Sequence, residues 1–364
     1  MSRIVLVCLS VLVGLTSCTK SPENAAPVGQ AAAPEASKAG GAEREVNLAI
    51  WANYLPPDIE AQVLKATGVR LKISHFSSNE ELLAKIQAGA TGIDVAVPSD
   101  YMVDILAKTD QLEPLDKAQI PNAAGVDPKL LKQPFDPENK FSIPFAWTTA
   151  GIAINRELYK GQLKSWKDVF ATKDLAGKIS FLDDVRETMA PALKANGYSV
   201  NSTNPEELKK AQATLKEFRP RLKMFRSDTI DLLVNKEVSV AQTYSIDALR
   251  ANRKLGGDHI TYFIPEEGGT IAIDNMVILK SAKNKTEALA LINFFLKPET
   301  NIEFVKSVLA GPVLTGTRAA LPKELQENQA LFPSDATRKK LESIHDVGEA
   351  TRLYDRAWTE LKTE

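Results

Sequence analysis

Residues 46–100, VNLAIWANYLPPDIEAQVLKATGVRLKISHFSSNEELLAKIQAGATGIDVAVPSD, decide the fold class of this protein. Short apolar runs alternate there with amphipathic segments, Gly68 is placed to end a helix, and Ser78 is placed to begin one. The predicted elements are a strand at 46–51, a helix at 58–67, a strand at 70–76, a helix with apolar positions Leu82, Leu83 and Ile86, and a strand at 94–97. This alternation predicts an α/β fold with a parallel sheet covered by helices.

The alternation continues from about residue 150. Strands are predicted at 151–155, 178–182, 238–242, 260–263 and 270–279, with helices at 187–196, 205–218 and 286–296. A final helix is predicted from the spacing of Val347, Leu353, Tyr354, Ala357 and Leu361. Residues 46–364 exceed the ~250–300 residues at which a single hydrophobic core stops growing, so we expect two lobes.

The N-terminus has the features of a lipoprotein signal. Arg3 precedes a short apolar run at residues 4–13, which falls below the roughly 20 residues that span a bilayer. The run closes on residues 15–18, Leu-Thr-Ser-Cys, which resemble a bacterial lipobox in which Cys18 is lipidated. The alternative is an ordinary cleaved signal in which Cys18 has no role. We expect a signal peptide at residues 1–18 and an extracytoplasmic protein held to a bacterial membrane by lipid alone.

Residues 19–45 contain mostly Ala, Pro, Gly and Ser, which predicts a flexible linker. The two cysteines, Cys8 and Cys18, both lie in the signal region, so no disulfide is expected in the folded part. The formal net charge is −1 with no basic cluster, which argues against a nucleic-acid partner.

Catalytic motifs are not found. His75, His259 and His345 are scattered, and no GxSxG, HExxH or Walker A motif is present. We therefore expect a binding protein without a cofactor or metal rather than an enzyme.

Aromatic and acidic residues follow the carboxyl ends of several predicted strands. Ligands of open α/β sheets bind outside those ends, so these residues are expected to converge. Each one alone would be an ordinary helix cap or core residue. The candidates of this kind are Trp51, Tyr54, Ser99, Tyr101, Asp183, Asp184, Tyr244 and Asp247. Ring faces attract ammonium groups and pack on methylenes, and carboxylates pair with amines, so this combination suits a flexible organic cation.

The chain resembles the spermidine/putrescine-binding proteins of ABC transport systems from Leu48 to Leu361. The matching stretches are WANYLPP (51–57), VPSDY (97–101), KQPFDP (132–137), SIPFAW (142–147), DDVRE (183–187), PEEGG (265–269) and DVG (346–348). The resemblance implies a type II periplasmic-binding fold, in which a ligand closes a cleft between two lobes. The expected N-terminal lobe comprises residues 46–149 and 274–317, and the C-terminal lobe comprises 150–273 and 318–364.

Site roles follow from the same resemblance. Asp184 and Glu187 resemble carboxylates that hold one amine end, and Asp274 resembles the acid that holds an inner or opposite amine. Asp247 matches an aspartate of the putrescine-preferring members. Wall positions are implied for Trp51, Tyr54, Tyr101 and Tyr244, with Ser99 as a polar contact. Tyr244 stands where the family usually has a tryptophan.

The sequence departs from the family pattern at three positions. Ala272 replaces an aromatic residue, Asn53 replaces an acid of some members, and Ile344 replaces a glutamine of spermidine binders. The resemblance as a whole implies a monomeric binding protein for spermidine or putrescine, which delivers its ligand to an ABC permease and ATPase. The alternatives are the same fold with another amine or amino-acid-like cation as its ligand, and a lipoprotein that senses a ligand.

Overall fold

The computed structural model describes residues 44–52, 54–89 and 92–363, and residues 43–364 form one compact unit. The strands are β1 (Glu45–Trp51), β2 (Arg70–Phe76), β3 (Val95–Ala96), β4 (Leu112–Glu113), β5 (Ser142–Asn155), β6 (Ile179–Phe181), β7 (Leu222–Phe225), β8 (Val240–Tyr244), β9 (Ile260–Phe263), β10 (Gly269–Leu279) and β11 (Leu341–Glu342). The α/β fold class is therefore confirmed. The expected linker gives its last residue, Glu45, to β1.

The helices are α1 (Ile59–Thr67), α2 (Asn79–Gln87), α3 (Asp100–Lys108), α4 (Trp166–Ala171), α5 (Val185–Ala195), α6 (Pro205–Phe218), α7 (Thr229–Val234), α8 (Ser245–Leu255), α9 (Lys285–Phe295), α10 (Pro298–Val308), α11 (Thr317–Ala320), α12 (Lys323–Gln326), α13 (Asp335–Arg338) and α14 (Thr351–Thr363). The predicted boundary residues act as expected. Gly68 ends α1 with a left-handed φ of 68°, and the Ser78 side chain accepts a hydrogen bond from the Glu81 backbone N–H at 3.1 Å. No helix in this part of the chain is long and apolar enough to cross a membrane.

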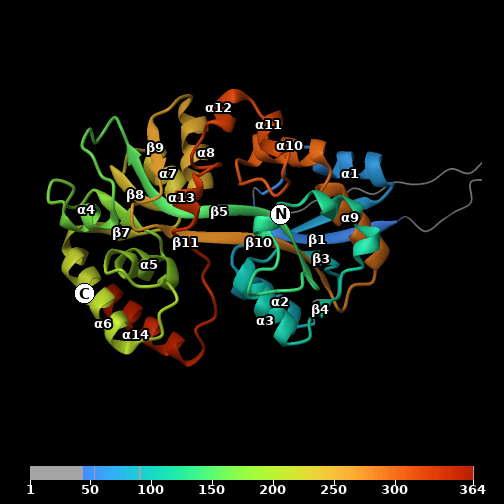
Figure 1. Cartoon of the computed structure of the whole chain (residues 1–364), viewed down its shortest axis with the longest axis horizontal. Helices are drawn as coiled ribbons and strands as arrows, with labels where there is room; N and C mark the ends of the chain where they lie inside the picture. Colours follow the sequence, from blue (N-terminus) through green and yellow to red (C-terminus); the bar gives the residue numbers. More distant parts are fainter. Residues whose placement is uncertain (1–43, 53, 90–91, 364) are drawn as a thin grey trace, which may run out of the picture. The chain divides into compact units, whose positions relative to one another are not determined.

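The sheet is mixed, so the prediction of a parallel sheet was wrong. Its main strand order is β2-β1-β3-β10-β5-β8-β6-β7, with β4 and β11 paired to β10 and β9 paired to β5. Pairs such as β1–β2 and β6–β8 are parallel, whereas β10 is antiparallel to β3 and to β5. The two long strands β5 and β10 run side by side through the centre of the molecule (Figure 1).

Strand β5 is much longer than the strand predicted at 151–155, because a bulge lets it pass through Pro144. Asp274 of β10 pairs with Ala146 and Asn275 pairs with Pro144, so Phe145 is the extra residue on β5. Proline has no N–H to donate, and a bulge is one of the few places where a sheet tolerates it. The proline therefore marks an irregularity inside the strand rather than its end.

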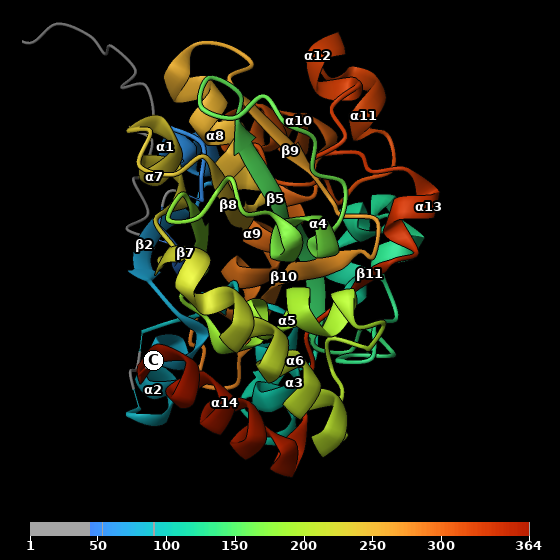
Figure 2. The same cartoon turned by 90° about the vertical axis from the view of Figure 1, so that its left-hand side faces the viewer.

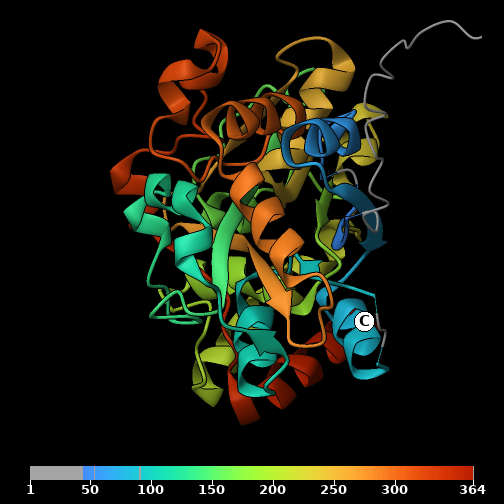
Figure 3. The same ribbon diagram turned by 90° about the vertical axis from the view of Figure 1, so that its right-hand side faces the viewer.

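The apolar residues form several separate clusters. One joins α1, α9 and α10 to β1, and a second contains the inward faces of α2 and α3. A third is shared by α4, α5, α6 and α14, and a fourth contains α7 and α8. Figure 2 shows α14 alongside α6, and Figure 3 shows α1 (blue) and α9 (orange) from the outside. The lobe boundaries expected from the resemblance remain a prediction.

The C-terminal helix is shorter than expected. It begins at Thr351, so Val347 lies before it, and Leu353 is 37% exposed instead of buried. The side chains that pack inward are Tyr354, Ala357 and Leu361, which are spaced by three and four residues.

Candidate functional site

Asp274 lies on β10 at the bulge and is the most connected of the candidate residues. Its side chain is 6% exposed. Tyr54 Oη donates to Asp274 Oδ2 at 2.7 Å, and Ser99 Oγ donates to Asp274 Oδ1 at 2.8 Å. Burial raises the pKa of Asp274 to about 6, although the two hydroxyl donors favour the charged form. Tyr54, Ser99 and Asp274 thus form one hydrogen-bonded group.

The bulge residue helps to place Tyr54. The Phe145 ring packs against Tyr54 with centroids 6.0 Å apart, and Phe304 of α10 packs on the same tyrosine at 6.0 Å. Ser99 follows β3, begins α3 and forms an isolated β-bridge with Asp274. The three hydrogen-bonded residues therefore come from three different chain segments that meet at β10.

Asp184 and Glu187 lie at the N-terminus of α5, after β6. Asp184 caps the helix by accepting hydrogen bonds from the backbone N–H groups of Arg186 and Glu187, both at 2.8 Å. Glu187 is 5% exposed, and Thr270 Oγ1 donates to its carboxylate at 2.8 Å. Burial raises the pKa of Glu187 to about 8, and the nearby charge of Asp184 adds to the rise.

Asp184 combines a capping role with an exposed position. Its side chain is exposed, but loss of part of its hydration still raises its pKa. The charge of Glu80 raises the pKa further. Its two hydrogen bonds from the backbone oppose this rise. Asp183, the neighbouring candidate, instead forms a surface ion pair with Lys362 at 2.6 Å.

Two tyrosines lie near the α5 carboxylates. Tyr101 of α3 donates from its hydroxyl to Glu80 Oε1 at 2.9 Å. Tyr244 is the last residue of β8, and burial raises its pKa well above the usual range, with further rises from the charges of Glu187 and Asp184. The charge of Asp184 thus contributes to the raised pKa of both tyrosines.

Asp247 lies in the first turn of α8, where Thr229 Oγ1 donates to its Oδ2 at 3.2 Å. Burial raises the pKa of Asp247 to about 6, while the nearby Arg250 guanidinium opposes the rise. The charge of Asp247 also contributes to the raised pKa of Tyr54 and of Tyr244. Asp247 is therefore within electrostatic reach of Tyr54, which is bonded to Asp274, and of Tyr244, whose pKa also responds to Asp184 and Glu187.

Trp51 forms no hydrogen bond with this group through its indole nitrogen. Trp51 ends β1 and packs edge-on against Phe76, with centroids 4.6 Å apart. Its buried indole Nε1 has no hydrogen-bond partner among the described residues. Cys18 and Asn53 lie outside the described residues.

Sequence reasoning missed two acidic residues beside the candidate site. Asp100 is 2% exposed and accepts hydrogen bonds from the backbone N–H groups of Tyr101 at 2.9 Å and of Ile273 at 3.4 Å. Burial raises the pKa of Asp100 to about 7. The second residue is Glu80. Both are in the first turn of a helix, where an acid ordinarily needs no further explanation, so the sequence held no signal for either.

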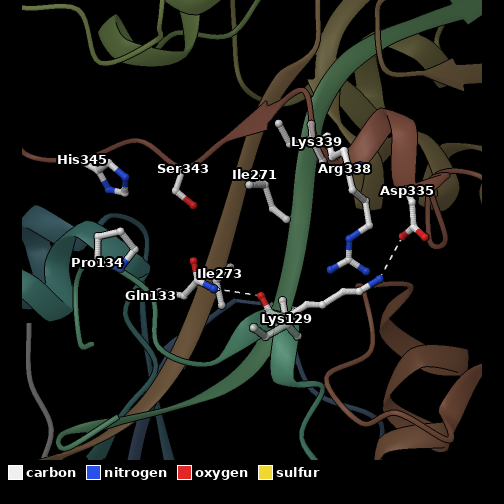
Figure 4. Close-up of a pocket in the computed structure, with 12 residues that line it drawn as sticks. Lys129, Gln133, Pro134, Ile271, Ile273, Asp335, Arg338, Lys339, Ser343 and His345 are labelled. Atoms are coloured by element: carbon white, nitrogen blue, oxygen red, sulfur yellow. Dashed lines mark hydrogen bonds and ion pairs between the residues drawn. The ribbon is translucent and has the colours of Figure 1, made fainter. Parts of the chain in front are cut away.

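A cavity of about 570 Å³ lies on the other face of β10. Successive side chains of a strand point to opposite faces, so Ile271 and Ile273 line the cavity while Ala272 and Asp274 face away from it. Figure 4 shows Lys129 paired with Asp335, next to Arg338, at one end of the cavity and His345 near the other. This excess of positive charge does not suit a cation, so we place the candidate site on the Asp274 face.

The site offers carboxylates and phenol rings with few compensating cations. Buried acids whose pKa values are raised gain from a ligand that brings positive charge. Among the described residues, no group of three or more His, Asp or Glu side chains could hold a metal ion. An organic cation is therefore the ligand that this arrangement suits best.

Comparisons with known proteins show the family to which the chain belongs. The family model for bacterial extracellular solute-binding proteins matches residues 60–333. The spermidine/putrescine-binding periplasmic protein of Escherichia coli strain K12 is 33% identical over 315 residues, which are 86% of this chain and 90% of that protein.

Solved structures give the same result. The spermidine/putrescine ABC transporter substrate-binding protein of Streptococcus pneumoniae has a TM-score of 0.82 at 31% identity, with 88% of this chain and 99% of that one covered. A Treponema pallidum lipoprotein, TpPotD, has a TM-score of 0.81 at 28% identity, with 88% and 100% covered. The predicted type II periplasmic-binding fold is confirmed, and so is the expectation of a solute-binding component rather than an enzyme. The chain belongs to the family of bacterial extracellular solute-binding proteins, among the relatives of the spermidine/putrescine-binding periplasmic proteins.

Proposed function

We propose that this protein captures a polyamine, spermidine or putrescine, and delivers it to an ABC permease and its ATPase. The observation that carries the proposal is the pair of acidic groups on different elements. Asp274 on β10 is held by two hydroxyl donors, while Asp184 and Glu187 lie together at the start of α5. A linear amine with a charge at each end fits such a pair.

Electrostatics support this assignment. A buried carboxylate without a cation costs free energy, and an ammonium group that pairs with it offsets that cost. The phenol rings of Tyr54, Tyr101 and Tyr244 supply faces for the methylene chain and its charges, at about 0.5–2 kcal/mol per cation–π contact. The proposed binding residues are Trp51, Tyr54, Ser99, Tyr101, Asp184, Glu187, Tyr244, Asp247 and Asp274.

A second ligand class is favoured by Ala272. This residue lies two positions before Asp274 on β10 and therefore on the same face, where the relatives' pattern implies an aromatic wall. Ile344 is half-buried between Ser343 and His345 and cannot hydrogen-bond an amine through its side chain. Another organic amine or an amino-acid-like cation is the alternative ligand.

We also propose that Cys18 carries a lipid that holds the monomeric protein outside the cytoplasm. The sequence at residues 15–18 supports this, and the TpPotD relative is itself described as a lipoprotein. A ligand-sensing lipoprotein is the alternative role. Metabolic labelling with a radioactive fatty acid tests the anchor, because Cys18→Ala should abolish incorporation. Equal incorporation in the variant would contradict it.

Calorimetric titration tests the ligand. The full chain is unfolded and refolded to remove any bound ligand, then titrated with spermidine, putrescine, cadaverine, spermine and several amino acids. We expect micromolar or tighter binding of one polyamine. The absence of heat with every polyamine, from a protein with a cooperative unfolding transition, would contradict the proposed function and favour a different cation.

A further inference from the structure

The cavity of about 570 Å³ behind β10 takes no part in the proposed cation site and has a chemistry of its own. Its volume lies within the range of about 300–1,000 Å³ that is usual for small-molecule sites. Three stretches of the chain line it: residues 129–134, β10, and the segment that runs from α13 through β11 to His345. The cavity is therefore built where stretches that are distant in the sequence meet.

The polar lining of the cavity is mainly basic. Among the described residues that line it, Lys129, Arg338 and Lys339 face a single acid, Asp335. Lys129 and Arg338 lie beside Asp335 at one end (Figure 4), and Lys129 Nζ is 3.0 Å from Asp335 Oδ1. The charges of Arg338 and Lys339 also act on this carboxylate and, with Lys129, lower its pKa. An anion at this end of the cavity would thus be attracted by three cations.

The present partners of these cations are weak ones. The pair of Lys129 and Asp335 joins side chains that are 60% and 79% exposed, so solvent screens it and a ligand can replace it. The Arg338 guanidinium is 4.0 Å from Asp127 Oδ2, at the limit of an ion pair. Its other contact is with the Trp147 ring, 5.7 Å from the ring centroid, which leaves its N–H donors for an anion.

The rest of the cavity is largely apolar. Ile271 and Ile273 of β10 line its middle, and Leu341 of β11 also lines it. Ser343 and His345 lie towards the end away from Asp335 (Figure 4). A guanidinium group matches a carboxylate through two parallel N–H donors. The lining therefore suits a ligand that has one carboxylate and an apolar body.

We propose that this cavity is a second binding site, which takes a small organic carboxylate with its charge at Lys129 and Arg338 and its apolar body on Ile271 and Ile273. The site is distinct from the proposed polyamine site, because Ile273 and Asp274 point to opposite faces of β10. Asp335 competes with the ligand's carboxylate for Lys129.

Saturation-transfer NMR with the full chain and hexanoate tests the site. We expect saturable binding of hexanoate. Acetate, which lacks the apolar chain, and hexan-1-ol, which lacks the charge, should each bind at least tenfold more weakly as competitors. The absence of saturable hexanoate binding would overturn the proposal. Equal binding of hexan-1-ol would also overturn it, because the basic end would then have no role.

Two substitutions with opposite effects test where hexanoate binds. Arg338→Gln should weaken hexanoate binding at least fivefold, because it removes the guanidinium. Asp335→Asn should strengthen binding at least threefold, because it removes the competing carboxylate. The matched control is Lys340→Gln, which changes the net charge as Arg338→Gln does. Lys340 donates to the Glu266 carbonyl, and neither residue lines the cavity.

An exposed cation provides a test that does not depend on the packing of Arg338. Lys339→Gln changes an exposed residue and should weaken hexanoate binding at least twofold, even if Arg338→Gln fails to fold. Urea unfolding checks that each variant is folded. Wild-type affinity in Lys339→Gln and Asp335→Asn would overturn the proposal. A loss in Lys340→Gln equal to that in Lys339→Gln would overturn it too, because only the net charge would then matter.

Discussion

Tyr54 and Asp274 are separated by 220 residues in the sequence, yet the phenol of the first donates a 2.7 Å hydrogen bond to the carboxylate of the second. The bond joins the segment after β1 to the central strand β10. It also holds one carboxylate oxygen in place, while Ser99 holds the other. Asp274 is therefore oriented before a ligand arrives, which reduces the entropy lost on binding.

Asp274→Asn should weaken spermidine binding at least tenfold. The substitution keeps the shape of the side chain and one carbonyl oxygen, but it removes the charge that would pair with an ammonium group. Calorimetric titration measures the loss. Asp258→Asn, an exposed acid outside the site, is the matched control and should bind as the wild type does. Wild-type affinity in Asp274→Asn would remove that residue from the site.

Glu187→Gln should stabilise the ligand-free protein, and the gain should grow with pH. The pKa of Glu187 is raised from 4.5 to about 8, so the folded state holds this proton more tightly than the unfolded state. The stability that this tighter proton binding gives the folded state is complete below the pKa of the unfolded state, 4.5, and is lost as the pH rises towards 8. Between pH 6 and 8 the advantage of Gln over Glu should increase by about 2 kcal/mol.

Urea unfolding at the two pH values measures this difference. Glu206→Gln again serves as the control, since that acid is exposed and lies outside the site. A pH-independent difference between Glu187→Gln and the wild type would show that Glu187 titrates normally. In the same variant, spermidine affinity should fall.

Polyamine binding should release protons near pH 7. The pKa values of Glu187 and Asp274 are raised to about 8 and about 6, and pairing with an ammonium group would lower both. Because binding favours the charged carboxylates, affinity should rise from pH 6 to 8, by up to about tenfold per pH unit for each proton released. Titration in two buffers with different ionisation heats counts the protons. Net proton uptake would contradict the assignment.

Ala272→Trp should tighten spermidine binding by roughly 2- to 30-fold, the equivalent of one cation–π contact. Ala272 pairs with Thr148 in the ladder between β10 and β5 and shares a face with Asp274. Ala272→Leu is the control, because it adds volume without a ring face. Equal gains in both variants would indicate packing rather than cation–π attraction. Weaker binding of the tryptophan variant would indicate that the site has no room at this position.

Much of the fold was predictable because strand and helix periodicities are local. The expected strand at 260–263 and helix at 205–218 match β9 and α6 at both ends. The course of β5 was not predictable, because it depends on pairing with β10, more than a hundred residues away. Leu353 fits the helical spacing but points to solvent, since periodicity does not fix which residues a neighbouring helix covers.

The candidate site was predictable in part. Ser99 and Asp184 follow strands as expected, Tyr244 instead ends one, and Asp274 came only from the resemblance to a family. Glu80 and Asp100 came only from the structure. Glu80 accepts a hydrogen bond from Tyr101 of α3, and Asp100 accepts one from Ile273 of β10, and a single sequence does not record such contacts between elements.

The extra residue at Phe145 shifts the register between β5 and β10 by one residue and so divides their ladder into two parts. On the Asp274 side of that break, alternate residues face either the acidic site or the basic cavity behind it. A one-residue insertion or deletion there would exchange the two faces and present isoleucines where the acid now stands. The proposed site could therefore change its ligand by substitution at Ala272 and Asp274, whereas length changes in this part of β10 should be eliminated by selection. A library of single-residue insertions along β10, sorted for ligand binding, would make that constraint visible.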